Sequence, residues 1–394
     1  MRKRLSFLLS FITLAYCAGA QIQPAQEVTG SVSGHVFCSD TNQPARFALV
    51  LLQPAPTRQE TPKHGVMQGS PTVRTGLDGS FHFPKVKPGT YFLIADFAGY
   101  ISPLAKASSQ QINSSAQADV EKVEKLLVKV TVSANKDSSV DIELERGAAL
   151  SGTVHYDDGS SASGLHIALY HQQDDGKFQL LHAQIGSLSF MGAEVRTDDN
   201  GRFRIAGLPA GKYVIETTFP SERLSLGGLF GTPGMATVYS DESAALHVYS
   251  GNVFRLKEAK PIEVVAGDEH DGADIIVPLL GLHSVSGAVL AVRDDHALNA
   301  GEVELDYADD KTFMRKAGVD TDGRFNFLYV PAGDYILRVT NAADMVRQLV
   351  NNGTMSYEGN KLAHAYGSAQ QAITVTDDLS NLIVRVPEKA PQKP

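Results

Sequence analysis

The side chains that could do chemistry in this chain are scattered along it. Twelve histidines are present. His166 and His171 are the closest group in the sequence, but they would lie on opposite faces of one strand. Glu269-His270-Asp271 falls in an acidic turn, where solvation accounts for it. No nucleophile elbow, zinc-protease motif, P-loop or dinucleotide fingerprint occurs. We therefore predict no catalytic residue, no cofactor and no enzyme activity. An unrecognised active site would need polar residues that converge in one cleft.

Aspartate pairs in turns are the strongest metal candidates. Asp320 and Asp322, like Asp198 and Asp199, could hold calcium through carboxylate and carbonyl oxygens. A third turn of this kind keeps only Asp78, and none of the turns has the length or the distal glutamate of a known calcium loop. We predict no metal ligand here and leave calcium at these turns as an open alternative.

Aromatic side chains are the candidates for carbohydrate binding, because sugar-binding surfaces present aromatic faces to pyranose rings. The chain has no Trp. We prefer the alternative that its aromatic residues pack long insertions onto a scaffold, since scattered apolar residues are normal on surfaces. An exposed flat arrangement would favour sugar binding, and burial would favour packing. The candidate ligand-contact residues are Tyr239, Tyr249, Phe254, Tyr357 and Tyr366.

A stretch that occurs three times must position these residues. Its copies begin at Asp78, Asn200 and Asp322, with 122 positions between successive copies. Asp-Gly or Asn-Gly opens each copy, apolar residues then alternate with polar ones, and a Gly-containing turn precedes a second alternation. Each copy predicts a β-hairpin with one apolar face, which further strands must cover. The signature residues are Asp78, Gly79, Phe81, Gly89, Tyr91, Asn200, Gly201, Phe203, Gly211, Tyr213, Asp322, Gly323, Phe325, Gly333 and Tyr335.

The tyrosine of each copy (Tyr91, Tyr213 and Tyr335) is expected to bury its ring and to bond its hydroxyl group to nearby backbone. Further short strands flank each copy, and few stretches read as helix. One exception is a short amphipathic helix within 106–127, on which Val120 and Val123 share a face with Leu127. The pattern predicts an all-β protein made of antiparallel β-sandwich modules.

The expected organisation is a signal peptide (1–20), a linker (21–28), module 1 (29–145), module 2 (146–280), module 3 (281–388) and a tail (389–394). A basic start, an apolar run and Ala18-Gly19-Ala20 predict export with cleavage before Gln21. The alternative is a lipoprotein anchored at Cys17, although Tyr16 stands where a lipobox needs a small residue. Insertions after each copy, 219–254 and 341–370 among them, are expected to carry specificity. We expect the mature chain to have no transmembrane span.

Cleavage would remove three basic residues and leave 32 basic against 44 acidic ones, a formal net charge of −12 instead of −9. An acidic chain without a basic run is a poor nucleic-acid binder. Cys38 would be the remaining cysteine of the exported chain, so no disulfide within that chain is expected. We expect Cys38 to be a buried small hydrophobic residue.

The repeats resemble carboxypeptidase regulatory-like domains. Two copies carry the motif: Thr321-Asp322-Gly323-Arg324-Phe325 with Pro331-Ala332-Gly333-Asp334-Tyr335, and Thr197 to Gly201 with Pro209 to Tyr213. The first copy departs from it, with Lys87-Pro88-Gly89 at the second turn. The resemblance covers nearly all of 29–388. It implies a transthyretin-like, carbohydrate-binding-like β-sandwich fold and a non-catalytic accessory role in exported bacterial proteins.

We therefore expect an exported, non-catalytic interaction or scaffold protein of the cell envelope, either periplasmic or secreted. Its partner would be an envelope or extracellular protein or a polysaccharide, with each insertion offering a contact surface. The alternative is a polysaccharide-binding protein that uses the tyrosines of the insertions.

Overall fold

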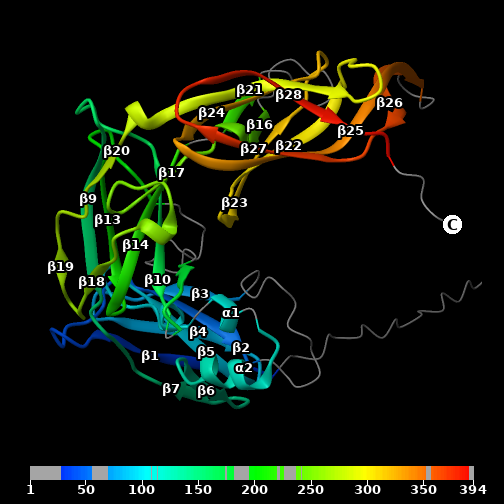
Figure 1. Cartoon of the computed structure of the whole chain (residues 1–394). Helices are drawn as coiled ribbons and strands as arrows, with labels where there is room; N and C mark the ends of the chain where they lie inside the picture. The colour runs from blue at the N-terminus through cyan, green and yellow to red at the C-terminus, as the bar shows by residue number, and fades with distance from the viewer. Residues whose placement is uncertain are drawn as a thin grey trace, which may run out of the picture.

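The computed structural model describes residues 28–55, 70–107, 109–112, 114–173, 175–181, 195–219, 222–225, 237–240, 242–351 and 356–389. Its regular structure is almost entirely β-strand, arranged mainly in antiparallel sheets (Figure 1). The predicted all-β class is therefore confirmed. The described core residues form three large clusters, which fall within 32–144, 148–277 and 285–386. We keep the predicted modules as names for these three parts of the chain.

Module 1 has two four-stranded sheets and a small helical cap. One sheet contains β1 (Gly30–Cys38), β4 (Ser80–Val86), β7 (Asp137–Ser139) and β8 (Ile142–Leu144). The other contains β2 (Leu49–Pro54), β3 (Thr72–Arg74), β5 (Gly89–Asp96) and β6 (Val128–Val132). The cap consists of a 3₁₀ turn (Pro103–Lys106), α1 (Ser109–Ile112) and α2 (Gln117–Glu124).

Module 2 repeats this plan. One sheet contains β9 (Ala148–Tyr156), β13 (Arg202–Leu208), β19 (Glu269–His270) and β20 (Ile275–Val277). The other contains β10 (His166–Gln172), β11 (Phe178–Leu180), β12 (Val195–Arg196), β14 (Gly211–Thr218), β17 (His247–Tyr249) and β18 (Ile262–Val264). A small hairpin pairs β15 (Glu222–Ser225) with β16 (Thr237–Ser240), and 3₁₀ turns cover Glu242–Ala244, Leu256–Glu258 and Leu279–Gly281.

Module 3 has the longest strands. One sheet contains β21 (Leu282–Ala291), β24 (Arg324–Pro331) and β28 (Leu379–Val386). The other contains β22 (Ala300–Tyr307), β23 (Asp310–Gly318), β25 (Gly333–Asn351), β26 (Ser356–Ala365) and β27 (Ala369–Val375). In every module the first strand pairs antiparallel with the first strand of the repeated stretch and parallel with the closing strand (β8, β20 or β28).

The predicted hairpin in each copy is wrong. β4 pairs with β1 whereas β5 pairs with β2 and β6, so the two strands of one copy lie in opposite sheets. A bulge residue with positive φ precedes each crossing, at Lys85, Gly207 and Tyr329. The pairing register shifts beside each bulge. Crossing lets the apolar faces of both strands cover the same core from its two sides.

The predicted hydroxyl contact of the tyrosine is confirmed in all three modules, whereas the predicted ring burial holds for Tyr213 and Tyr335 but not for Tyr91, which is half-buried. The hydroxyl group of Tyr91 donates to the carbonyl oxygen of Lys87 at 2.9 Å. Tyr213 donates to Pro209 at 2.7 Å, and Tyr335 donates to Pro331 at 2.8 Å. Each bond spans four residues, so it fastens the second turn of the copy. The first copy keeps the bond although its turn sequence differs.

Two insertions differ from the sequence expectation. The predicted helix of module 1 exists but ends at Glu124, and Val123 and Leu127 pack with Ile94 in a satellite core. The segment 341–370 is not a loop, because β25 continues through Asn351 and β26 returns beside it as a long hairpin. No period-two signal marked this strand, because apolar and polar residues come in adjacent pairs along Asp344–Val350 instead of alternating.

Cys38 is buried, as predicted. Among the described residues, no helix is both long enough and apolar enough to cross a membrane.

Candidate functional site

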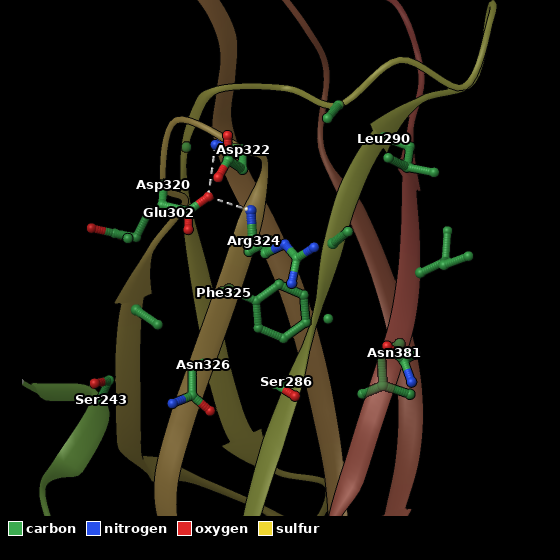
Figure 2. Close-up of a pocket in the computed structure, with 18 of the residues that line it drawn as sticks. Ser243, Ser286, Leu290, Glu302, Asp320, Asp322, Arg324, Phe325, Asn326 and Asn381 are labelled. Atoms are coloured by element: carbon green, nitrogen blue, oxygen red, sulfur yellow. Dashed lines mark hydrogen bonds between the residues drawn. The ribbon is translucent and has the colours of Figure 1, made fainter.

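A groove of about 1150 Å³ runs along the open side of module 3, where the edge strands of its two sheets, β23 and β24, face each other (Figure 2). It continues over the outer face of β21 and β28. Its floor is formed by Phe325, whose ring lies beneath Gly287. The polar and charged residues that line it are Ser243, Ser286, Glu302, Lys316, Asp320, Asp322, Arg324, Asn326 and Asn381.

Alternation along the strands explains which side chains reach this groove. Phe325 and Phe327 are buried in the core, so Arg324 and Asn326 between and beside them point outward. The same alternation on β21 places Ser286 outside between two inward positions, Val285 and Gly287. Arg324 is exposed, and in the described part of the chain its guanidinium group makes no ion pair. The groove therefore offers hydroxyl, amide and guanidinium groups for hydrogen bonds.

The candidate calcium ligands beside this groove hold the turn itself. The Asp320 carboxylate accepts the backbone N–H groups of Asp322 at 2.9 Å and Arg324 at 2.7 Å (Figure 2). Asp198 accepts those of Asn200 and Arg202 in the same way, at 2.9 and 2.8 Å. These are Asx-type turns that need no ion. Within the described ranges, no three His, Cys, Asp or Glu side chains gather as a metal site would require.

Module 2 has a second groove at the corresponding place, between β12 and β13, with a volume of about 620 Å³. Arg202 stands where Arg324 stands in module 3, one residue after the repeated glycine. Thr153 hydrogen-bonds Asp274 at 2.8 Å, and Ser151 bonds Asp271. Arg204 forms an ion pair with Glu269 at 2.8 Å. Arg202 and Arg324 were missed by the sequence analysis, although an arginine at the same position of two copies was a signal for them.

The three aromatic candidates whose side chains the structure describes do not form an exposed face. Tyr249 and Tyr366 are buried, at 7% and 5% exposure, and Phe254 is half-buried and packs against the core of module 2. The side chains of Tyr239 and Tyr357 lie outside the described residues. Burial of Tyr249 and Tyr366 agrees with the preferred packing alternative and removes these two rings as exposed sugar contacts, because each ring is enclosed within its module.

Tyr249 belongs to a buried polar cluster in module 2. The Tyr170 hydroxyl group donates to Glu216 at 3.3 Å, and Nδ1 of His247 lies 2.6 Å from the same carboxylate. Burial would raise the pKa of Glu216, but the hydrogen bond and charge of His247 lower it overall. Burial and Glu216 together raise the pKa of Tyr249. None of these side chains lines either of the two grooves.

A second polar cluster lies at the far end of module 3 and was also missed. His296 contacts Asp294 through Nδ1 and lies 3.1 Å from Asp344 through Nε2. The Tyr366 hydroxyl group donates to Asp344 at 2.9 Å. The hydrogen bond to Asp294, followed by that to Asp344, raises the pKa of His296. Desolvation and Asp344 raise the pKa of Tyr366 to about 12. Both ring nitrogens of His296 are engaged, so the ring is held rather than free to act as a base.

The histidines considered from the sequence do not converge. His171 stacks on Tyr213 at 4.8 Å between ring centroids, and His166 lies at the other end of β10. Glu269 pairs with Arg146 and Arg204. None of these residues forms a site with another candidate.

No family model and no curated protein matches the chain. Among solved structures it is similar to a streptococcal ancillary pilin (10% identity, TM-score 0.30), covering 92% of this chain and 100% of that chain. It is similar to the minor pilin GBS52 of Streptococcus agalactiae (13% identity, TM-score 0.26, 63% of this chain and 99% of that one). It also resembles the Bacillus anthracis TIE protein (13% identity, TM-score 0.20), covering 92% of this chain but only 51% of that one, about half its length. TM-scores this low carry no argument about function.

Proposed function

We propose that this chain is an exported, non-catalytic interaction protein built of carboxypeptidase regulatory-like modules, acting in the cell envelope or outside the cell. The observation that carries the proposal is the pair of grooves at corresponding places in modules 2 and 3. Each groove lies along an open sandwich edge and presents an exposed arginine from the repeated stretch. A repeated groove on a rigid sandwich is an arrangement for binding an extended partner.

The polar clusters support the non-catalytic part of this proposal. His296 is held by carboxylates at both ring nitrogens, and Nδ1 of His247 lies against the Glu216 carboxylate, so acidic partners fix both rings. Neither cluster opens into either groove. The arrangement suits stability at module ends more than proton transfer to a substrate.

The experiment for the groove uses a photoreactive amino acid at Asn326, with the same amino acid at Lys122 on α2 as the control. We expect a discrete adduct with an envelope or extracellular component from the groove position alone. Adding Arg324→Ala should reduce that adduct. Adducts of equal yield and identity from both positions would contradict the proposal.

Polysaccharide binding is the second candidate function. The observation in its favour is the combination of Ser286, Asn326 and Asn381 with exposed Ile383 in one groove, since sugars need both hydrogen bonds and apolar contact. Purified chain from Gln21 onward would be run through gels containing soluble polysaccharides. Retardation that Arg324→Ala and Asn326→Ala abolish, but Lys122→Ala does not, would favour this function over protein contact. Normal mobility throughout would exclude the tested glycans.

A further inference from the structure

The two junctions inside the chain follow one rule. We call the end of a module where its first strand begins the proximal end, and the end where that strand stops the distal end. At the first junction, the backbone of Tyr100, at the distal end of module 1, lies against Gly207, the bulge residue of module 2. At the second junction, the carbonyl oxygen of Ser243 in module 2 accepts from Arg315, which also bonds the carbonyl groups of Leu328 and Tyr329 at the bulge of module 3. In both cases a distal end docks on a proximal end.

Charged side chains lie at both junctions, where Arg146 covers the Tyr100 ring of module 1 at 5.3 Å and ion pairs join modules 2 and 3. Arg146, in the segment that leaves module 1, forms an ion pair with Glu269 of module 2 at 3.3 Å. Arg255 and Lys257 of module 2 both pair with Asp309 of module 3, and Arg255 lies over the ring of Tyr307 at 4.3 Å. At the second junction the distal side supplies the cations and the proximal side supplies the carboxylate, whereas Arg146 and Glu269 at the first junction both belong to module 2.

The distal end of module 3 is built like the distal end of module 1. Tyr366 forms an isolated bridge with Glu388, as Tyr100 does with Arg146. The loops after their first strands close with equivalent hydrogen bonds, from Cys38 to Gln43 and from Ala291 to His296. In module 1 this end carries the next module. In module 3 it is exposed within the described residues, with an exposed valine, Val292, beside it.

The charges at the two outer ends are reversed relative to the junction between modules 2 and 3. Glu388 stands where Arg146 stands, with three aspartates near it, Asp294, Asp295 and Asp344. Arg293, Arg385 and two histidines, His296 and His364, offset these four carboxylates in part. The proximal end of module 1 is basic. Lys85 is its bulge residue, Lys87 follows, and Lys136 approaches Gly30 at the start of β1. The two outer ends are therefore complementary to each other.

We propose that the distal end of module 3 binds the proximal end of module 1 of a second copy of this chain, so that copies associate head to tail. The contact continues the docking rule of the two internal junctions and reverses the charges of the second one. A heterologous contact of this kind closes into a ring or extends as a chain of copies. It is separate from the grooves and stands whether or not they bind a ligand.

The test measures the mass of the purified chain from Gln21 onward by light scattering during size-exclusion chromatography. We expect mass above one copy that increases with protein concentration and falls when sodium chloride is raised from about 50 mM to about 500 mM, because the contact is charged. A single-copy mass at every concentration and salt level would overturn the proposal.

Charge reversals then locate the contact. The proximal variant (Lys85→Glu with Lys136→Glu) and the distal variant (Asp294→Lys with Glu388→Lys) should each remain single copies. An equimolar mixture of the two should associate again, because complementary ends are restored. The control reverses two lysines of α2, Lys122→Glu with Lys125→Glu, and should associate like the parent. The single substitution Glu388→Lys leaves the Asp294–His296 contact intact. If it also weakens association, the effect of the distal variant does not come from a folding defect at that contact. Association that survives both variants, or that the control also abolishes, would disprove this contact.

Discussion

At the scale of single residues, Asp96 stands out among the described carboxylates because its surroundings oppose its charge. It ends β5 with 2% exposure, and neither carboxylate oxygen has a hydrogen-bond partner in the described structure. It lies two residues from Ile94, on the face that carries the satellite core under the helical cap. Burial raises the pKa of Asp96 to about 6, against a smaller lowering by the backbone N–H group of Phe97, which lies near the carboxylate without making a hydrogen bond to it.

We expect Asp96→Asn to stabilise module 1 at neutral pH. The folded pKa of about 6 exceeds the unfolded value of 3.8, so the wild-type protein loses stability as the pH rises from 3.8 to about 6. Above that pH the folded state bears the full free-energy cost of the buried charge. A shift of this size corresponds to at most about 3 kcal/mol at pH 7. Urea unfolding at pH 3.5 and pH 7.5 measures it, and the gain should disappear at the lower pH. Equal effects at both pH values would show that shape, not charge, matters at this position.

His296 gives the opposite pH dependence. Asp294 and Asp344 raise its folded pKa above the unfolded value of 6.5, so its stabilisation is complete below that pH and is lost as pH rises through the folded pKa. We expect His296→Gln to lower the melting temperature of module 3 at pH 6 by more than at pH 9. Thermal unfolding at the two pH values measures this difference, with His155→Gln in module 2 as the control. A constant difference would mean that the ion pairs contribute nothing.

At the scale of elements, the glycine of each module's first strand allows the closing segment to cross it. A Cβ atom at Gly287 would overlap the carbonyl oxygen of Leu382, and Gly34 and Gly152 stand in the same relation to Val140 and Ala273. The closing segment can therefore approach the first strand closely only where that strand carries a residue without a Cβ atom. This close packing explains the glycine of the Ser-Gly pair at the start of each module.

We expect Gly287→Ala to destabilise module 3 by about 1–3 kcal/mol, because the closing strand β28 must move away from β21. Gly318→Ala is the matched control, since a Cβ atom there meets nothing within 4 Å and its φ is not in the left-handed region. Denaturant midpoints of the two variants would be compared. Similar midpoints would refute this role of the close approach.

The repeated stretch explains how much of the fold could be predicted. The alternation of apolar and polar residues located the strands, and the positions of Gly and Tyr located the turns. Strands and turns could be predicted because each depends on neighbours within about ten residues. The partner strand was misassigned, since β4 and β5 are close in sequence but lie in opposite sheets. Short spacing favours a hairpin, and nothing local records that the bulge at Lys85 turns the chain across the core. The groove was missed for the same reason, because it forms between β23 and β24 of different sheets.

At the scale of the whole molecule, insertions predicted as contact surfaces serve partly as internal junctions. The described part of the second insertion supplies Ser243 to module 3, and Arg255 follows directly after it. Sequence periodicity cannot show this, since the junction joins residues more than 50 positions apart. The buried positions of Tyr249 and Tyr366 were unpredictable for a similar reason, as each ring is covered by strands far away in the chain.

Arg255→Ala should loosen the junction between modules 2 and 3. It removes a partly buried cation over Tyr307 and an ion pair with Asp309, contributions of about 1–2 kcal/mol together. We expect small-angle X-ray scattering to show a broader distribution of distances, with little change in the unfolding of either module. The control is Arg385→Ala, which breaks an ion pair with Asp295 inside module 3. An unchanged distribution would mean that Arg315 and Ser243 hold the junction by themselves.

The parallel pairing of each module's first and closing strands sets the order in which the chain can fold. His35 and Asp141, which meet along this pair, are 106 residues apart. Contacts between residues so far apart are slow to form, because a long loop must close before they give any stabilisation. The first strand of a module therefore waits, without its parallel neighbour, until nearly the whole module has been synthesised or has emerged from a translocation channel. A nascent module can therefore complete its fold only when its last strand has been added. Truncation of that strand should destabilise the module more than deletion of an insertion of equal length.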